Sequence, residues 1–189
     1  MMWLKTLRCW CATHGPDYRK NKWRRLARVV LRCGEYAGVK FSDHVIAISD
    51  TIHDQILAAY KRKSRVIHNG VHLPRRSVQN GFLDSIGVKS GQYVLPSFHE
   101  GLPIALLEAM SYGLPVLVPD IPANREVGLA KEQYFTCGDV NDLKEKIQFH
   151  LDNPMDMAET SRYRTWIQQK YNWETIAEQT VKVYEEDLR

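Results

Sequence analysis

The sequence Pro96-Ser-Phe-His-Glu-Gly-Leu-Pro-Ile-Ala-Leu-Leu-Glu-Ala-Met-Ser-Tyr-Gly-Leu-Pro-Val-Leu-Val118 joins a charged turn, a helix and a buried strand in one unit. Pro103 suits the first turn of a helix, where its missing N–H costs no hydrogen bond. Gly113 can take the left-handed conformation that ends a helix. We therefore expect a helix over about Leu102 to Tyr112, followed directly by an apolar strand.

The start of this helix predicts an anion-binding site. The first turn of a helix leaves amide N–H groups unpaired and carries the positive end of the helix dipole, so a phosphate or diphosphate binds well there. Glu100 and Glu108 would repel a phosphate, but their oxygens can accept hydrogen bonds from sugar or ribose hydroxyls beside it. The alternative is a capped helix with two surface glutamates.

The full string resembles the E-x7-E segment of retaining, nucleotide-sugar-dependent glycosyltransferases of the GT-B fold, family four. The matching residues are Ser97, Glu100, Gly101, Pro103, Glu108, Ala109, Gly113, Pro115 and Val116. The resemblance implies that Glu100 faces the donor sugar and that Glu108 holds the nucleotide ribose. It also implies that the backbone formed by Gly101, Leu102 and Pro103 contacts the donor diphosphate, and that the reaction needs no metal or other cofactor.

The resemblance extends over nearly the whole chain. It includes residues 13–19, 43–50, 66–71, 134–140 and 170–177. In the first of these segments, His14 follows a predicted strand, and the resemblance implies that its side chain faces the donor sugar and the acceptor. Open α/β sheets place ligand-facing residues at the ends of their strands. The alternative is a purely structural histidine.

The pattern of strands and helices predicts an α/β fold made of Rossmann-like parallel β/α units. Short apolar strands at 8–13, 44–49 and 65–68 alternate with helical patterns. The chain has 189 residues, 44% of them apolar and 25% charged, which is typical of a globular protein with one or two small domains. We expect the remnant of an acceptor-side domain at 1–72, a shortened donor domain at 73–169 and a crossover helix at 170–189.

The strand before the charged turn indicates that an internal segment is missing. Residues 92–95 run straight into Pro96, whereas two parallel strands need a crossover of about a dozen residues between them. In the resembled family, an arginine and a lysine that neutralise the diphosphate follow the first strand of the donor domain, and earlier strands precede the region that matches residue 1. We therefore expect a truncated GT-B glycosyltransferase with impaired catalysis. The alternative is a non-catalytic remnant that binds a nucleotide or a partner.

A truncated sheet would also leave strand edges unpaired, and unpaired edges favour association with another chain. We therefore expect self-association or a partner, with the strand at 92–96 or the strand at 8–13 at or near the contact.

The overall formal charge is only +4, but basic residues crowd one predicted helix, Tyr18 to Ala37, which contains Arg19, Lys20, Lys22, Arg24, Arg25, Arg28 and Arg32. Its apolar residues Trp23, Leu26, Val30 and Ala37 recur at helical spacing, which predicts an apolar face in the core and a basic face opposite. The basic face is suited to anionic lipid headgroups. The alternative, which the sequence favours, is a solvated helix face whose apolar side packs in the core. Nucleic acid is disfavoured as a partner because no nucleic-acid-binding module is recognisable.

The cysteines Cys9, Cys11, Cys33 and Cys137 have neither zinc-site spacing nor a disulfide framework, so reduced thiols are expected. The first residues lack the long apolar segment of a signal peptide, and no later segment is long enough to span a bilayer. These features predict a cytoplasmic protein, with peripheral contact at the inner face of the membrane. The expected partners are a nucleotide-sugar donor and a glycan or lipid-linked acceptor.

Overall fold

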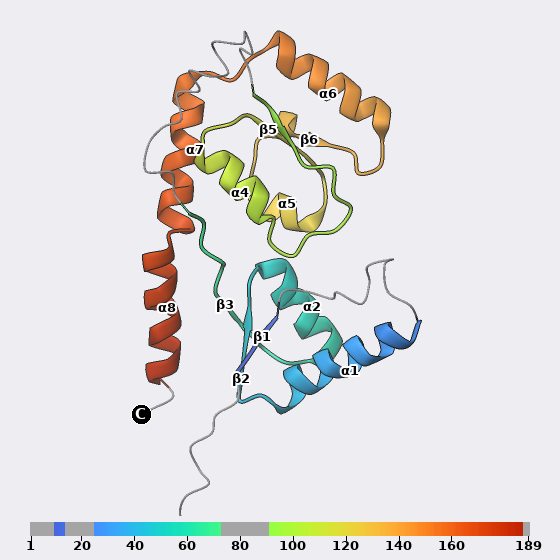
Figure 1. Cartoon of the computed structure of the whole chain (residues 1–189), viewed down its shortest axis with the longest axis vertical. Coiled ribbons are helices and arrows are strands. Elements are labelled where there is room, and N and C mark those ends of the chain that lie inside the picture. The colour runs from blue at the N-terminus through green and yellow to red at the C-terminus, as the bar shows by residue number, and fades with distance from the viewer. Residues whose placement is uncertain (1–9, 14–24, 73–90, 187–189) are drawn as a thin grey trace, which may run out of the picture. The chain divides into compact units, whose positions relative to one another are not determined.

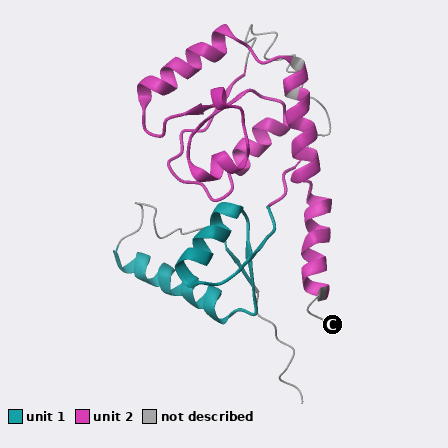
Figure 2. Cartoon of the chain, turned by 180° about the vertical axis from the view of Figure 1, so that it is seen from behind, with its two compact units in different colours: residues 1–68 teal, residues 69–189 magenta. Residues whose placement is uncertain are grey.

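The computed structural model of the chain describes residues 10–13, 25–72 and 91–186. The chain divides into two compact units, residues 1–68 and 69–189 (Figure 2). The boundary falls at 68/69, before the predicted one at 72/73, and the C-terminal segment belongs to unit 2. The sequence also predicts a linker near residues 73–76 and a short helix near 81–86, and both lie outside the described residues.

Unit 1 is built of alternating strands and helices (Figure 1). Its elements are β1 (Trp10–Thr13), α1 (Arg25–Phe41), β2 (His44–Ala47), α2 (Asp50–Tyr60) and β3 (Arg65–Val66). The three strands are parallel, in the order β1-β2-β3, with Thr13 opposite Ala47 and Ala47 opposite Val66. This confirms the predicted parallel β/α alternation.

The helices of unit 1 are fixed by short-range polar contacts and by close packing. The Ser49 hydroxyl caps α2 by accepting a hydrogen bond from the Ile52 amide at 3.3 Å. Helix α1 approaches β1 so closely that a Cβ atom on Gly38 would lie 2.9 Å from Cys11 Sγ. The tyrosine hydroxyl of Tyr60 on α2 donates a hydrogen bond to Glu35 on α1 at 2.7 Å. One side of α1 is therefore held against the rest of unit 1.

The prediction that the apolar stripe of α1 packs in the core was wrong for the described residues. Leu26 is 77% exposed and Val30 is 63% exposed, and Ala37 is also exposed. The buried side of the helix instead carries Val39, which is fully buried. Periodicity in the sequence showed that α1 is amphipathic, but the residues that pack on β1 and α2 lie on another face. Trp23 lies outside the described residues.

Unit 2 contains a second parallel sheet, with strand order β4-β5-β6. Its elements are β4 (Tyr93–Val94), α4 (Ile104–Ser111), β5 (Val116–Pro119), α5 (Pro122–Glu126), a 3-10 turn η2 (Lys131–Gln133), β6 (Tyr134–Phe135), α6 (Val140–Asp152), α7 (Met157–Lys170) and α8 (Trp173–Glu186). Sequence patterns predict the three strands, near 93–95, 115–119 and 133–135, and four of the helices, near 102–112, 140–151, 156–169 and 174–187. They do not predict the short helix α5 or the turn η2.

The core of unit 2 lies around β5 and α4. All four residues of β5 are buried, and Leu106, Leu107 and Met110 of α4 are almost completely buried. Helix α7 packs against α4, and Arg164 of α7 donates a hydrogen bond to the carbonyl of Tyr112 at 3.2 Å (Figure 1). Helix α4 is thus covered both by its own sheet and by a second helix.

The beginning of unit 2 is fixed to the junction between α7 and α8. The Val71 amide donates a hydrogen bond to the Tyr171 carbonyl at 2.9 Å. A Cβ atom on Gly70 would lie 2.3 Å from the indole ring of Trp173, the first residue of α8. A residue with any side chain at position 70 would therefore have to displace the Trp173 ring, or shift α8 or the chain that enters unit 2.

Candidate functional site

The charged turn connects β4 directly to α4, as the sequence predicted. Leu95 donates its amide hydrogen to the Leu117 carbonyl at 3.0 Å, and the chain then leaves the sheet at Pro96. Helix α4 begins at Ile104, with Pro103 at its N-cap, and it ends before Gly113, whose φ of 74° is left-handed. The helix is therefore slightly shorter than predicted, because Leu102 and Pro103 form the approach to it rather than its first turn.

The start of α4 has no side-chain cap among the residues that the structure describes. Pro103 has no hydroxyl, amide or carboxylate that could accept hydrogen bonds from the first-turn amides. Leu102 and Pro103 are buried, whereas Ile104 and Ala105 at the start of the helix are exposed. The positive end of the helix dipole is therefore accessible to an anionic ligand.

Three ionisable groups gather at this corner. Glu100 is half-buried in the turn, and Glu108 is exposed on α4. Burial raises the pKa of the half-buried Tyr93 on β4, and the negative charges of Glu100 and Glu108 raise this pKa further. Both carboxylates therefore lie close enough to act electrostatically on the Tyr93 phenol. Tyr93, which no motif indicated, is a third ionisable group near the two glutamates that the sequence singled out.

The neighbouring strand ends are ordered by carboxylates. Asp120, which follows β5, accepts hydrogen bonds from the Cys137 amide at 3.0 Å and from Arg125 at 3.1 Å. The Cys137 amide is the main cause of the lowered pKa of Asp120, and Arg125 lowers it further. Asp142 accepts a hydrogen bond from the Thr136 amide at 2.6 Å, and this bond lowers its pKa. These contacts fix the loops that follow β5 and β6.

A pocket of about 190 Å³ lies at this edge of the sheet. Its walls come from residues that end or follow the three strands and from the beginning of α6: Pro96, Ser97, Phe98, Pro119, Phe135, Cys137, Gly138, Asp139, Val140 and Leu143. Open α/β sheets bind ligands at the carboxyl ends of their strands. The pocket shares Ser97 and Phe98 with the charged turn, so it extends the candidate site along this edge.

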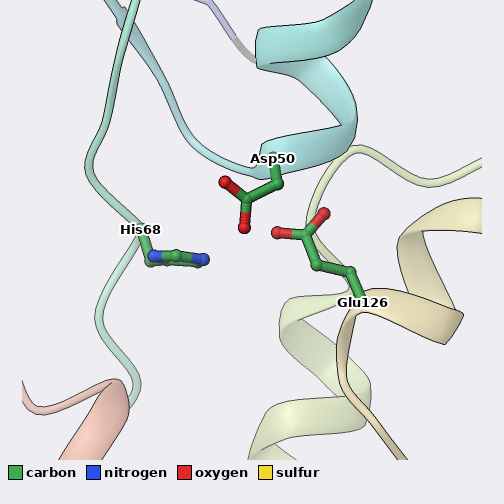
Figure 3. A group of neighbouring side chains, drawn as sticks. All are labelled: Asp50, His68 and Glu126. Carbon is green, nitrogen blue, oxygen red and sulfur yellow. The ribbon is translucent and has the colours of Figure 1, made fainter.

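The predicted site residue of unit 1, His14, lies outside the described residues. The residue before it, Thr13, ends β1 at the same edge where β2 and β3 end. Asp50 and His68 follow these two strands (Figure 3). Glu126, also drawn there, belongs to unit 2. A carboxylate and an imidazole both bind divalent metals, but two ligands of unit 1 do not make a metal site.

Two family models match the chain. Residues 77–185 match the family described as glycosyl transferases group 1, and residues 2–75 match the family described as glycosyltransferase family 4. The first match covers more than half of the chain and includes the whole E-x7-E segment.

Similar proteins agree with these matches. A protein of Haemophilus influenzae named as an uncharacterized glycosyltransferase is 25% identical over 172 residues, which cover 87% of this chain and 44% of the relative. The chain thus spans less than half the length of that relative. Among solved structures, sucrose-phosphate synthase from Thermosynechococcus elongatus has a TM-score of 0.73 at 17% identity, covering 95% of this chain and 67% of that one. TarM has a TM-score of 0.69 at 15% identity, covering 95% and 51%.

At these identities, the two structures establish the fold alone, which is the α/β fold of GT-B glycosyltransferases. None of the described helices is long and apolar enough to cross a membrane. The family match supplies what the fold cannot: this chain belongs to the glycosyl transferases group 1 family.

Proposed function

We propose that this chain takes part in the transfer of a sugar from a nucleotide-diphosphate donor to a glycan or lipid-linked acceptor, with retention at the anomeric carbon. The donor diphosphate binds at the start of α4, the sugar lies beside Glu100, and the ribose hydroxyls bind Glu108. His14 acts on the acceptor side. No metal is required, because helix amides serve as the groups that neutralise the diphosphate.

One observation carries this proposal. Glu100 in the turn and Glu108 on α4 are both near enough to Tyr93 to raise its pKa, and the first turn of α4 between them has no side-chain cap. A ligand that carries both hydroxyls and a diphosphate satisfies both features, because the carboxylates accept hydrogen bonds and the helix start attracts negative charge. A simple anion would leave the two carboxylates without a role.

Catalysis in such a site depends on stabilising the charge of the leaving diphosphate. Between Gln92 and Pro103 the sequence contains no arginine or lysine, and His99 is its only other basic side chain. Loss of one preorganised stabilising group typically costs about 10²–10³ in rate. We therefore expect slow turnover by the isolated chain. Rapid transfer would mean that other residues supply the missing positive charge.

Two partner expectations complete the proposal. A lipid-linked acceptor would bring the protein to a membrane surface as a peripheral protein.

In the described part of unit 2, β4 pairs with β5 on one side and has no strand partner on its other edge. An open edge favours pairing with another chain, so self-association through β4 is part of the proposal.

The proposal is tested by replacing the ribose-binding carboxylate. Glu108→Gln keeps the shape of the side chain but removes its charge, and we expect it to weaken binding of a nucleoside diphosphate by about tenfold, which corresponds to about 1.4 kcal/mol. Glu145→Gln, at an exposed position on α6, is the matched control. Calorimetry with the diphosphates of uridine, guanosine and adenosine measures both variants. Equal affinity of the two variants for every diphosphate would overturn the assignment of Glu108.

Glu100→Gln gives an independent test on the reaction. If Glu100 faces the transferred sugar, this variant should lose what hydrolysis or transfer the chain performs and still bind the nucleoside diphosphate. Unchanged turnover in Glu100→Gln would show that the reacting sugar lies elsewhere. A complete absence of turnover in the unmodified chain, with diphosphate binding retained, would favour the non-catalytic alternative.

A further inference from the structure

The exposed face of α1 is a continuous apolar stripe. It is formed by Leu26, Val29, Val30, Cys33, Ala37 and Phe41, which recur at spacings of three and four residues on one side of the helix. Leu26 is 77% exposed, Val30 is 63% exposed and Phe41 is 75% exposed. Isolated exposed apolar residues are normal, but a row of them along a whole helix marks a surface that binds something.

The opposite side of α1 is already occupied. Val39 is fully buried, Glu35 accepts the hydrogen bond from Tyr60, and Gly38 approaches Cys11. Arg62 also donates hydrogen bonds to three carbonyls around the end of the helix, those of Lys40, Ser42 and Asp43. Because these contacts fix the rotation of α1 within unit 1, the stripe cannot turn inward without breaking them.

Cations border the stripe. Arg25 and Arg32 are exposed along one border of the stripe, about two helical turns apart, and the exposed Lys40 lies near the C-terminal end of the helix. Glu35 is the only acidic residue of α1, and it is the residue that Tyr60 binds. An apolar stripe with a cationic border fits an anionic lipid surface, where aliphatic side chains enter the acyl region and the cations meet phosphate headgroups.

We propose that α1 docks unit 1 on an anionic membrane surface by inserting this apolar stripe, with Arg25, Arg32 and Lys40 at the headgroups. The stripe favours a membrane over a nucleic acid as the partner, because a nucleic acid offers no surface that would bury a row of aliphatic side chains. This docking differs from the sequence prediction, in which the apolar face packed in the core and only the basic face contacted the lipids. It is independent of the proposed sugar transfer, because it needs no donor site.

The test is co-sedimentation of the full chain with vesicles of about two parts phosphatidylcholine to one part phosphatidylglycerol, and with vesicles of phosphatidylcholine alone. We expect binding to the mixed vesicles and at least tenfold weaker binding to the neutral ones. The double variant Leu26→Gln with Val30→Gln should reduce binding to the mixed vesicles by about tenfold or more, as should Arg25→Gln with Arg32→Gln.

A matched control is the double variant Leu151→Gln with Val181→Gln, which alters two exposed apolar residues of unit 2, 59% and 50% exposed, and should bind like the unmodified chain. Circular dichroism confirms that each variant keeps its helices. Failure of the unmodified chain to bind the mixed vesicles would overturn the proposal, and so would binding that the Leu26 and Val30 changes leave intact. Light scattering gives a further contrary outcome: if those changes convert a dimer into a monomer, a second copy covers the stripe.

Discussion

Helices α1 and α4 both belong to parallel β/α units, yet they use their apolar residues in opposite ways. Helix α4 buries Leu106 and Leu107 completely between β5 and α7, whereas α1 exposes Leu26 and Val30 along its whole outer side. The two helices differ in what surrounds them. Amphipathic spacing shows that a helix has an apolar face, but the neighbouring elements decide whether that face becomes core or surface.

The largest expected effect is a difference in stability between leucine-to-alanine variants of the two helices. Leu106→Ala removes a fully buried side chain and should lower the free energy of unfolding of unit 2 by about 2–5 kcal/mol. Leu26→Ala changes a side chain that is 77% exposed and should alter stability by no more than about 0.5 kcal/mol. Urea unfolding measures both. A loss of several kcal/mol in Leu26→Ala would mean that the stripe of α1 is covered in solution.

A second effect concerns the close contact between Gly70 and Trp173 in unit 2. Gly70→Ala places a Cβ atom where the Trp173 ring lies and should lower the free energy of unfolding by about 1–3 kcal/mol. Gly34→Ala is the matched control, because a Cβ atom at Gly34 on α1 meets no atom within 4 Å. That control should stabilise α1 slightly through its higher helix propensity. Equal effects of both changes would show that Trp173 does not pack on Gly70.

The packing of α7 within unit 2 can be followed by pH. Burial raises the pKa of Tyr163 on α7 to about 12. Because this pKa lies above the ordinary value of 10.0, the tyrosine contributes stability that is fully present below pH 10 and is lost as the pH rises through about 12. Spectrophotometric titration should therefore show a tyrosine that ionises near pH 12, and Tyr163→Phe should remove this ionisation. A late tyrosine that persists in Tyr163→Phe would contradict the assignment.

The smallest effect is expected at the strand ends of the candidate site. The pKa of Asp120 is lowered below 3.8, chiefly by the Cys137 amide, so its contribution is present above this pH and is lost as the pH falls through the lowered value. Asp120→Asn should make unit 2 slightly less stable at neutral pH and less sensitive to acid. Acid unfolding curves of the two proteins compare this directly, and identical curves would exclude the role of Asp120.

Local patterns predicted most of the elements because strands and helices leave strong periodic signals. The strand before the turn, the turn itself and Gly113 were identified from apolar runs, glycine and proline, and the structure confirms them. The short helix α5 was missed because five residues are too few to show a helical period.

The site was predicted only in part, for a physical reason. Glu100 and Glu108 lie within one segment, so the sequence itself holds them close together. Tyr93 lies on β4 and Asp120 follows β5, and they come to this edge through sheet pairing that no local pattern contains. The exposed stripe of α1 escaped prediction for a related reason: its environment depends on long-range packing.

Titration of the unmodified chain with a nucleoside diphosphate and with the matching nucleoside tests the central claim most directly. If the start of α4 binds the diphosphate, the nucleoside diphosphate should bind at least about tenfold more tightly than the nucleoside, a difference of about 1.4 kcal/mol. Calorimetry with the uridine, guanosine and adenosine pairs covers the bases. Equal affinity within every pair, or no binding at millimolar ligand, would contradict the account.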